Sequence, residues 1–348
     1  LQYNPGWNSS AVNLLHVRAQ GPRDTLHYVW SSIGAPAVLL VASDSPDSSL
    51  SIDWPRLLSP SPAGAVRIEP PGSAVYATAV VFTKVREVLG VGRVPGHSWA
   101  GTAFPAPCVM VPSQCPRGDD AMSVSPQVTA YETHGRARRL PSLLHTPDSS
   151  QVEFVLAGVA PRGNSSRFVL EVATVEEPGV AQSLRSERSI DDEYTPTIFE
   201  VLSLVAESRT NSSTLSFLQW KATAYGSRSP GREDGIRCQA QGLQEASWTL
   251  PPSSIVQAYF GEGVGSTHSV SALNISFGGE EGRVYQEKRY LSWSVLLGFG
   301  QPPTDTFSPL VISIMAVALG TPLAMLLVGT CLVLLAQRKR YSEYEPIN

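Results

Sequence analysis

The chain has 348 residues with a formal net charge of -4, and 16% of its residues are charged. No surplus of Lys and Arg is present, which argues against nucleic acid as a partner. The first residue is Leu1 rather than Met, so we interpret the chain as a mature form from which a signal peptide has been removed. Frequent Ser, Thr, Pro and Gly residues favour a β-rich domain of the secretory system over a helical cytosolic one.

Short apolar or β-branched runs recur before residue 310 and predict β-strands. Pro-, Ser- and Asp-rich segments separate them and predict loops. The sequence has no long amphipathic helical pattern, so we predict an all-β, β-sandwich-like fold for this region. The predicted strands are residues 12–18, 26–30, 37–42, 74–85, 152–160, 168–175, 197–206, 214–225, 255–260, 270–277 and 284–297.

The stretch 176–196 is charged and has little β pattern, so we interpret it as a boundary between two lobes. The first predicted lobe spans residues 1–180 and the second spans residues 190–300. A short Pro-containing stalk at residues 301–309 follows. It keeps the predicted β lobes close to the apolar segment that begins at residue 310.

Residues 310–336 are uncharged and apolar throughout. A helix needs about 20 apolar residues to cross a bilayer, so we predict a transmembrane helix, with tilt or a kink at Pro322 taking up the excess length. Arg338, Lys339 and Arg340 follow at once, whereas residues 301–309 contain no Lys or Arg. The positive-inside rule then predicts a single-pass type I protein with a lumenal N-terminus and a cytosolic tail at residues 337–348.

Four Asn-X-Ser triplets, which are acceptors for N-linked glycans, begin at Asn8, Asn164, Asn211 and Asn274. All four lie on the side of the membrane that the flanking charges assign to the lumen, so we predict a glycoprotein. Asn274 falls within a strand pattern, and a glycan there requires its side chain to face outward, opposite to Leu273 and Ile275.

Of the four cysteines, Cys331 lies in the apolar segment and three precede it. Cys108 and Cys115 flank a Pro-rich loop and are our candidates for a disulfide bond, on closeness alone. Cys238 is then the odd thiol, either buried or paired between chains, and the other pairings stay open.

The run Arg136-Ala137-Arg138-Arg139 matches the pattern that furin-type proteases cut, with cleavage after Arg139. The alternative is an uncut basic surface loop. Two fragments on a reducing gel would support cleavage, and a single band would support the loop.

The tail ends in YSEYEPIN, where Tyr344 and Ile347 fit the sorting pattern Tyr-X-X-bulky apolar. An extended tetrapeptide of this kind can place its aromatic and aliphatic side chains in two pockets of a clathrin adaptor. Within the apolar segment, Ala316, Gly320 and Ala324 are spaced four residues apart and predict a flat stripe for contact with another membrane helix. The alternative reading of the stripe is the general richness of membrane helices in Gly and Ala.

No metal-ligand spacing, phosphate-binding Gly loop or nucleophile elbow occurs in the sequence. The six His residues are scattered along the chain. We therefore predict no catalytic, cofactor-binding or metal-binding residues.

Three segments together carry a resemblance to a known family: the N-terminal LQYNPGWNSS, the apolar span 310–336 and the tail YSEYEPIN. Over the whole chain, the layout resembles the glycosylated lysosomal membrane protein family of animals. The resemblance implies a heavily glycosylated type I protein of the lysosomal membrane. It also implies an accessory-subunit role beside a multi-spanning major facilitator transporter that exports dipeptides, with Tyr344 and Ile347 as the sorting signal.

The function that we expect is a non-enzymatic accessory subunit that shields its transporter from lumenal proteolysis and supports its stability and sorting. Two alternatives come from other classes. A membrane-tethered lysosomal hydrolase would need a deep lumenal pocket with a paired acid and base. A cell-surface receptor or adhesion glycoprotein would reside at the plasma membrane with Tyr344 intact.

Overall fold

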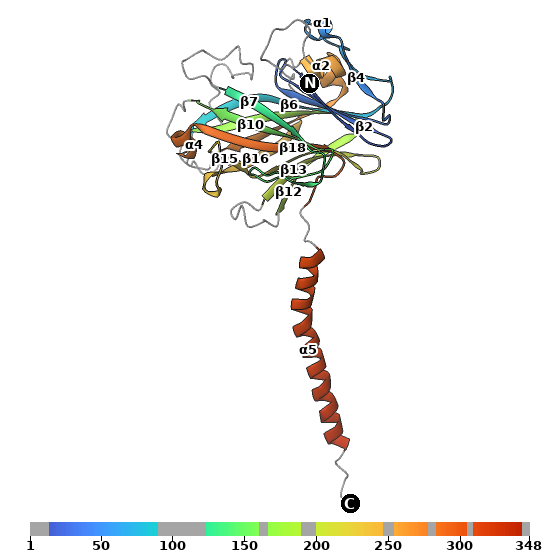
Figure 1. Cartoon of the computed structure of the whole chain (residues 1–348), viewed down its shortest axis with the longest axis vertical. Coiled ribbons are helices and arrows are strands. Elements are labelled where there is room, and N and C mark those ends of the chain that lie inside the picture. The colour runs from blue at the N-terminus through green and yellow to red at the C-terminus, as the bar shows by residue number, and fades with distance from the viewer. Residues whose placement is uncertain are drawn as a thin grey trace, which may run out of the picture. The chain divides into compact units, whose positions relative to one another are not determined.

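The computed structural model describes residues 14–89, 123–159, 166–188, 200–245, 254–277, 283–304 and 309–342. The residues up to Pro303 belong to one compact unit and those from Thr304 to a second. Strands dominate the first unit, and the described part of the second is built around one helix, α5 (Pro309–Ser342), as Figure 1 shows. The predicted class, an all-β region followed by a C-terminal apolar helix, is confirmed.

The first of two large antiparallel sheets begins with a meander, because each of its first three strands pairs with the next. Its later strands come from distant parts of the sequence and pair antiparallel with their neighbours, with a register shift in three of the four pairings. In spatial order, the first sheet consists of β1 (Leu14–Gln20), β2 (Thr25–Ser31), β3 (Ala37–Ser43), β6 (Ala74–Leu89), β11 (Ser166–Glu176), β17 (Ser269–Phe277) and β16 (Gly235–Glu245).

The second sheet is also antiparallel and centres on β18 (Tyr290–Phe299), which pairs with three other strands. In spatial order it consists of β7 (Ser123–Ala130), β10 (Ser150–Ala157), β18, β14 (Thr214–Lys221), β13 (Glu200–Ser208) and β12 (Val180–Arg188). The short strand β15 (Thr223–Tyr225) pairs with both β18 and β16 and so joins the two sheets along one side.

The main hydrophobic core lies between the two sheets. It takes alternate residues of each strand, such as Val38 and Leu40 of β3 and Trp293 and Val295 of β18. Trp293 also packs edge-on against Trp220 of β14, with 6.0 Å between ring centroids. Each such buried side chain contributes about 1.5–3 kcal/mol to folding, so this shared core makes the two sheets one sandwich.

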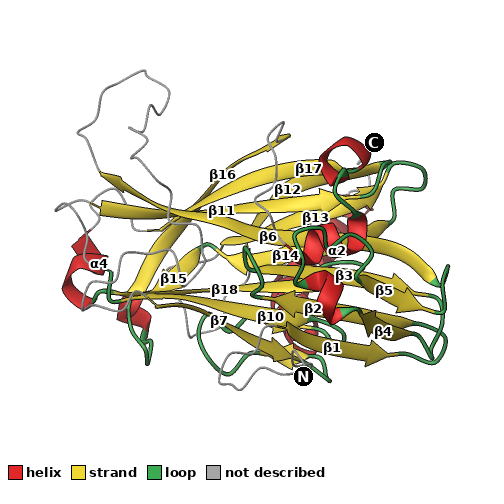
Figure 2. Ribbon diagram, turned by 90° about the horizontal axis from the view of Figure 1, so that it is seen from above, coloured by secondary structure: helices red, strands yellow, loops and turns green. Residues whose placement is uncertain are grey.

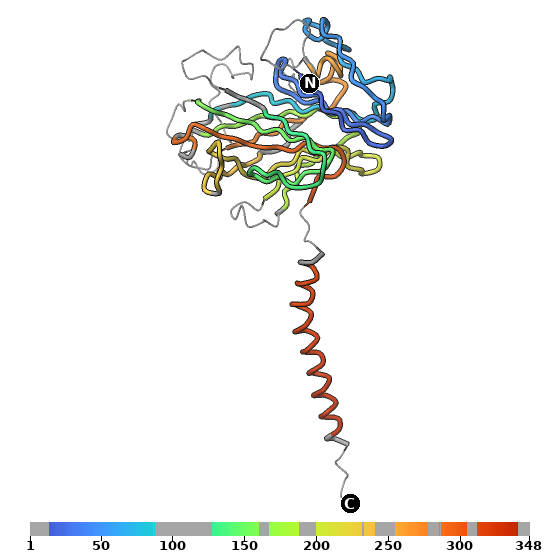
Figure 3. Tube along the Cα trace, viewed as in Figure 1, coloured from blue at the N-terminus to red at the C-terminus, as the bar shows by residue number. Residues whose placement is uncertain are grey.

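A second hydrophobic cluster covers the outer face of the first sheet. Short helices α1 (Trp54–Leu57), α2 (Ser254–Phe260) and α3 (Val264–Thr267) lie there with the hairpin of β4 (Ser49–Ile52) and β5 (Val66–Glu69). The Asp53 carboxylate accepts a 3.1 Å hydrogen bond from the Arg56 amide and caps α1, which also has Pro55 in its first turn. Figure 3 shows that α2 lies beside the N-terminal strands, far from it in sequence.

The outer face of the second sheet is covered in part by the segment that contains β8 (Gly135–Arg136) and β9 (Leu144–His145). Leu143 of this segment packs on Phe217 and Leu296. The Gln219 side-chain amide donates a 3.1 Å hydrogen bond to the Pro303 carbonyl, which holds the end of the domain to the same sheet. The turn η1 (Arg232–Asp234) and helix α4 (Arg283–Lys288) complete the first unit, and Figure 2 shows α4 at the end of the sandwich opposite to α2.

The expected division into two lobes is not what the structure shows. Each sheet contains strands from both expected lobes, since β11 pairs with β17 and β10 pairs with β18. Part of the charged stretch that suggested a boundary is strand β12, whose polar side chains lie at the edge of the second sheet. An edge strand tolerates such charges, so their presence did not mark a linker.

One predicted strand is wrong, and a second is wrong in part. Residues 255–260 lie in helix α2, and residues 284–288 lie in α4 before β18 begins at Tyr290. In α2, Ile255, Val256 and Ala258 are buried against the first sheet. A six-residue run with five apolar residues fits a buried helical turn as well as a buried strand, because the periodicity of so short a run does not separate the two.

Candidate functional site

Helix α5 contains the segment that can cross a membrane. Within the 28-residue stretch Ile312–Lys339, 18 consecutive residues have a mean hydropathy of 2.2, and none of these 18 is buried by protein. At about 1.5 Å per residue this stretch is about 42 Å long, which exceeds a hydrocarbon core of about 30 Å. The Thr321 and Thr330 hydroxyls each donate a 2.6 Å hydrogen bond to the carbonyl four residues earlier. Their polar groups are thereby satisfied inside the helix, as lipid requires.

The proposed contact stripe Ala316, Gly320 and Ala324 lies on α5, and all three residues are exposed. A side chain added at Gly320 would meet nothing within 4 Å. The stripe is therefore open to another helix, and its use in a contact stays a prediction.

Two of the four sequons lie in the described part of the chain. Asn211 is exposed in the turn between β13 and β14, where its Oδ1 accepts hydrogen bonds from the Ser213 amide and hydroxyl. Asn274 is half-buried on β17, while the neighbouring Leu273 and Ile275 are fully buried. This alternation places Asn274 on the face opposite to the core. Asn8 and Asn164 lie outside the described residues.

Several other predicted residues also lie outside the described residues, namely the disulfide candidates Cys108 and Cys115 and the sorting residues Tyr344 and Ile347. Cys238 on β16 is a free, buried thiol within the main core, and burial raises its pKa. The sequence left Cys238 either buried or paired between chains, and in this structure it is buried. Cys331 is a free thiol on α5.

The basic run Arg136–Arg139 is part of a hydrogen-bonded hairpin. The Ala137 amide donates to the Leu143 carbonyl, and the Ser142 amide donates to the Arg139 carbonyl, each at 2.9 Å. The Arg139 side chain lies 3.5 Å from the Glu153 carboxylate and donates a 3.1 Å hydrogen bond to the Arg228 carbonyl. The basic run is thus a folded surface segment, and it contacts the loop that contains Arg228.

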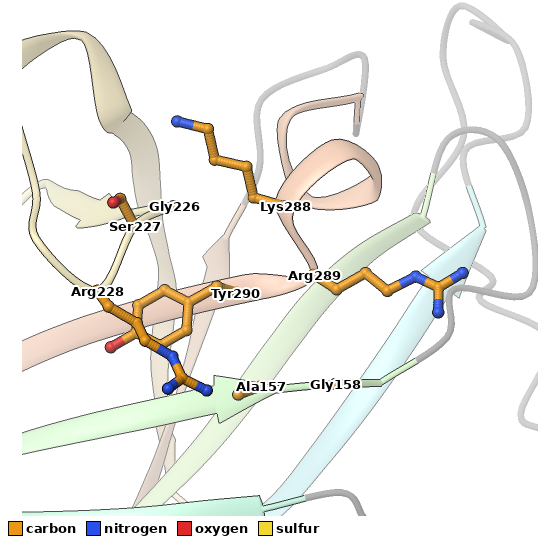
Figure 4. Close-up of a pocket in the computed structure, with 8 residues that line it drawn as sticks. All are labelled: Ala157, Gly158, Gly226, Ser227, Arg228, Lys288, Arg289 and Tyr290. Atoms are coloured by element: carbon orange, nitrogen blue, oxygen red, sulfur yellow. The ribbon is translucent and has the colours of Figure 1, made fainter. Parts of the chain in front are cut away.

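Two surface pockets of about 480 Å³ each flank this contact. Figure 4 shows the first, which lies where β10 ends, β18 begins and the turn between β15 and β16 passes over them. The Arg228 side chain lies beside the Tyr290 ring, and the Lys288 ammonium group lies on the Ser227 side of the pocket. No acidic residue lines this pocket in the described part of the chain.

The second pocket lies over β7, β10 and the hairpin of residues 135–145. His145 and Tyr131 stack at its wall with 3.6 Å between ring centroids. Burial lowers the pKa of His145, an effect that the backbone carbonyls of Thr133 and Arg136 oppose. Arg136, Arg138 and Arg139 also line the pocket, and Glu153 is its one acidic lining residue among those described.

A buried polar cluster joins the two sheets around Glu176 at the end of β11. Its carboxylate accepts hydrogen bonds from Thr78 at 2.8 Å, from Tyr76 at 2.7 Å and from Gln182 at 3.1 Å. Burial, with a smaller contribution from the neighbouring Glu177, raises the pKa of Glu176 to about 7 against the effect of the three donors. Sequence reasoning missed this site, since an acidic residue ending an apolar run looks like an ordinary exposed strand end.

A second buried polar chain runs through the first sheet. His16 and His27 stack with their ring nitrogens 3.0 Å apart, and the other His27 nitrogen lies 2.8 Å from the Ser48 hydroxyl. Burial, followed by nearby positive charge, lowers the pKa of both histidines to about 4. His27 and Ser48 are fully buried, so this arrangement holds the sheet to the loop at residue 48 and does not present a nucleophile.

The described residues contain no group of three or more His, Cys, Asp or Glu residues that could hold a metal ion. The geometry therefore offers a rigid sandwich, two cationic surface pockets and one apolar helix. A folded β domain joined to one helix long enough to cross a bilayer defines a membrane-anchored β-sandwich protein.

Comparison with known proteins gives the family. The family model described as glycosylated lysosomal membrane protein matches residues 13–91 and 113–340. The chain belongs to the glycosylated lysosomal membrane protein family, which confirms the resemblance carried by the two termini and the apolar span. It is thus a member of a family of lysosomal membrane glycoproteins, and the family name is not that of an enzyme.

The curated relatives match over almost the full chain. Glycosylated lysosomal membrane protein A of Xenopus laevis is 45% identical over 373 residues, covering 100% of this chain and 92% of the relative. The Homo sapiens protein is 40% identical, covering 100% of this chain and 90% of its own length. The Mus musculus protein is 41% identical, covering 99% and 88%.

Proposed function

We propose that this chain is a non-enzymatic accessory subunit of a multi-spanning lysosomal transporter. The proposed partner is a major facilitator transporter that exports dipeptides, as the family resemblance implies. In this role the β-sandwich shields the partner from lumenal proteases and supports its stability and sorting. The observation that carries the proposal is the division of the chain into one compact β unit and one lone apolar helix.

The shielding role follows from how proteases work. A protease binds its substrate as an extended strand, so it cuts chains that open locally. Here nearly every strand of the sandwich is hydrogen-bonded to neighbours, and its side chains fill a core shared by both sheets. A domain of this kind resists cutting and can cover loops of a partner that would otherwise be cut.

The orientation that the proposal requires is type I, with the sandwich in the lumen. Arg338 and Lys339 at the end of the apolar stretch support it, because basic residues favour the cytosolic side. Protease added outside intact lysosomes should leave the sandwich whole and remove only an epitope fused to the C-terminus. Loss of the sandwich under those conditions would contradict the orientation.

Sorting in this proposal depends on Tyr344 and Ile347, which a clathrin adaptor would bind as an extended segment. Tyr344→Ala should move the steady-state pool from lysosomes toward the plasma membrane. A chain that stays at the plasma membrane with Tyr344 intact would instead support the receptor alternative.

The experiment that tests the proposal is affinity purification of the full-length chain from lysosomal membranes, followed by mass spectrometry. A stoichiometric multi-spanning transporter is the expected result. Recovery of soluble substrates, or of no partner at all, would count against an accessory role.

The hydrolase alternative needs an acid and a base side by side in a pocket. Among the described residues, Glu153 is the one carboxylate that lines either surface pocket, and it lies 3.5 Å from Arg139. No observation on these residues favours hydrolysis over the accessory role.

A further inference from the structure

The two surface pockets adjoin each other and concentrate positive charge on a chain whose net charge is -4. Arg139 lines the second pocket and its guanidinium donates to the backbone carbonyl of Arg228, which lines the first. The surface formed by both pockets is called the basic groove below. Its cationic lining residues are Arg136, Arg138, Arg139, Arg228, Lys288 and Arg289.

Carboxylates compensate this charge only in part, because Glu153 lies 3.5 Å from Arg139 and Asp234 pairs with Lys288. Glu153 is the one acidic lining residue among those described. Asp234 lies beneath the groove, where it pairs with Lys288, and that contact lowers the pKa of Asp234. Glu233 and Glu287 are exposed on neighbouring elements and line neither pocket, but their charges also act on Lys288.

The groove is held in place by backbone hydrogen bonds. The Gly158 amide donates to the Arg289 carbonyl and the Gly226 amide donates to the Asp234 carbonyl, both at 2.9 Å. The Asp234 carboxylate also accepts a 2.9 Å hydrogen bond from the Gly231 amide, which closes the turn that carries Arg228. The cationic side chains therefore extend from fixed positions, which lowers the entropy lost when they bind a ligand.

We propose that the basic groove binds a sulphated oligosaccharide. Arg and Lys side chains form their strongest hydrogen bonds with anionic oxygens, and sulphate esters present several such oxygens. Each of the two adjoining pockets has three cationic lining residues, one of which (Lys288 or Arg139) also pairs with a carboxylate, so together they suit a chain that carries more than one anionic group. One small anion would need only one pocket.

Two other polyanions fit the groove less well. Single-stranded nucleic acid binds through aromatic rings on which bases stack, but the Tyr131 ring is stacked on His145 and the Tyr290 ring lies beside Arg228. Anionic membranes bind best where apolar side chains accompany the basic ones. The exposed large apolar residues of the described β unit are Leu58 and Val75, which line neither pocket.

The test measures binding of a heparin-derived hexasaccharide to the purified full-length chain in detergent by calorimetry. Arg228→Ala and Arg138→Ala each remove one cation, from the first and second pocket respectively. Each should weaken binding about threefold to tenfold, and the double variant should weaken it more than either. Affinity should also fall as salt is raised, because the contacts are ionic.

The controls are Arg23→Ala and Arg209→Ala, which remove the same charge from exposed turns elsewhere in the sandwich. They should change the affinity less than twofold, and all four variants should keep the wild-type unfolding temperature. Equal weakening by the controls, or no saturable binding to the wild type, would overturn the proposal.

Four further probes decide the chemistry of the ligand. A desulphated hexasaccharide should not bind, and inorganic sulphate should compete only as ordinary salt does. Equal or tighter binding of a DNA hexanucleotide, or of vesicles containing an anionic phospholipid, with the same sensitivity to Arg228→Ala would overturn the saccharide assignment. This inference is independent of the accessory-subunit proposal, because the measurement needs no transporter.

Discussion

The Tyr76 hydroxyl on β6 donates a 2.7 Å hydrogen bond to Oε2 of Glu176 at the end of β11, and both side chains are buried. The same hydroxyl lies 2.8 Å from the Ser216 hydroxyl on β14. The pair therefore connects the first sheet to the second at a point where a carboxyl group changes its charge near pH 7. The charge state of Glu176 therefore affects the stability of the contact between the two sheets.

The stability of the domain should depend on pH through Glu176. Its pKa rises from 4.5 to about 7 on folding, because burial disfavours the charged form. The folded state therefore binds a proton more tightly than the unfolded chain, so the stabilisation is fully present below pH 4.5 and is lost as pH rises through 7. The difference amounts to at most about 3 kcal/mol.

Glu176→Gln tests this dependence, because the amide stays neutral at every pH. Unfolding of the full-length chain should show the wild type losing stability between about pH 5 and about pH 7.5, while the variant loses much less. Glu207→Gln is the control, since Glu207 is a partly exposed residue that pairs with Arg185. Identical pH profiles for the wild type and Glu176→Gln would rule out this carboxyl group as the source.

Gly298 on β18 should tolerate no side chain. A Cβ placed there would lie 2.3 Å from the Phe217 ring, which is buried with Leu296 on the outer face of the second sheet. Gly298→Ala should therefore lower the free energy of unfolding by about 1–3 kcal/mol, measured by urea denaturation.

Gly265→Ala is the matched control, because a Cβ at Gly265 meets nothing within 4 Å. It should be close to neutral. Adding Phe217→Leu to Gly298→Ala should recover part of the loss, and a double-mutant cycle without such coupling would contradict the contact.

The membrane contact of α5 can be tested at Gly320. Gly320→Leu should reduce recovery of the partner transporter severalfold in affinity purification, because a large side chain prevents close approach of a second helix. Gly329→Leu is the control, since Gly329 is equally open in this structure and lies outside the stripe. Equal loss with both variants, or no loss with Gly320→Leu, would remove the stripe from the interface.

The bond after Arg139 should survive a furin-type protease while the chain is folded. The hydrogen bonds of Ala137 and Ser142 hold the segment in a hairpin, whereas the protease needs an extended strand. The native chain should run as one band on a reducing gel, and the urea-unfolded chain should give two. Arg139→Ala should remain uncut in both states, and rapid cutting of the native chain would contradict the folded hairpin.

Much of the fold was predictable because its signals are local. Residues 310–336 within α5 carry no charge and form an apolar run long enough to cross a bilayer, and the apolar or β-branched runs of β2, β3, β6 and β18 mark buried strands. Strand β12 and helix α2 were not predictable in the same way. The charged β12 is stable because it pairs with β13, and α2 owes its burial to the first sheet.

The buried cluster and the basic groove depend on contacts between distant residues. Tyr76 and Glu176 are 100 positions apart, and Arg139 and Arg228 are 89 apart. No local pattern around either residue signals its partner, because each contact arises only when the sheets pair and pack. The run of arginines was visible in the sequence, but its place beside a second cationic loop was not.

The most direct test of the accessory role is the half-life of the partner transporter in cells that lack this chain. The half-life should fall, and lysosomal protease inhibitors or re-expression of the full-length chain should restore it while transporter synthesis stays unchanged. A normal half-life without the chain, or a loss that protease inhibitors do not prevent, would contradict the proposed shielding.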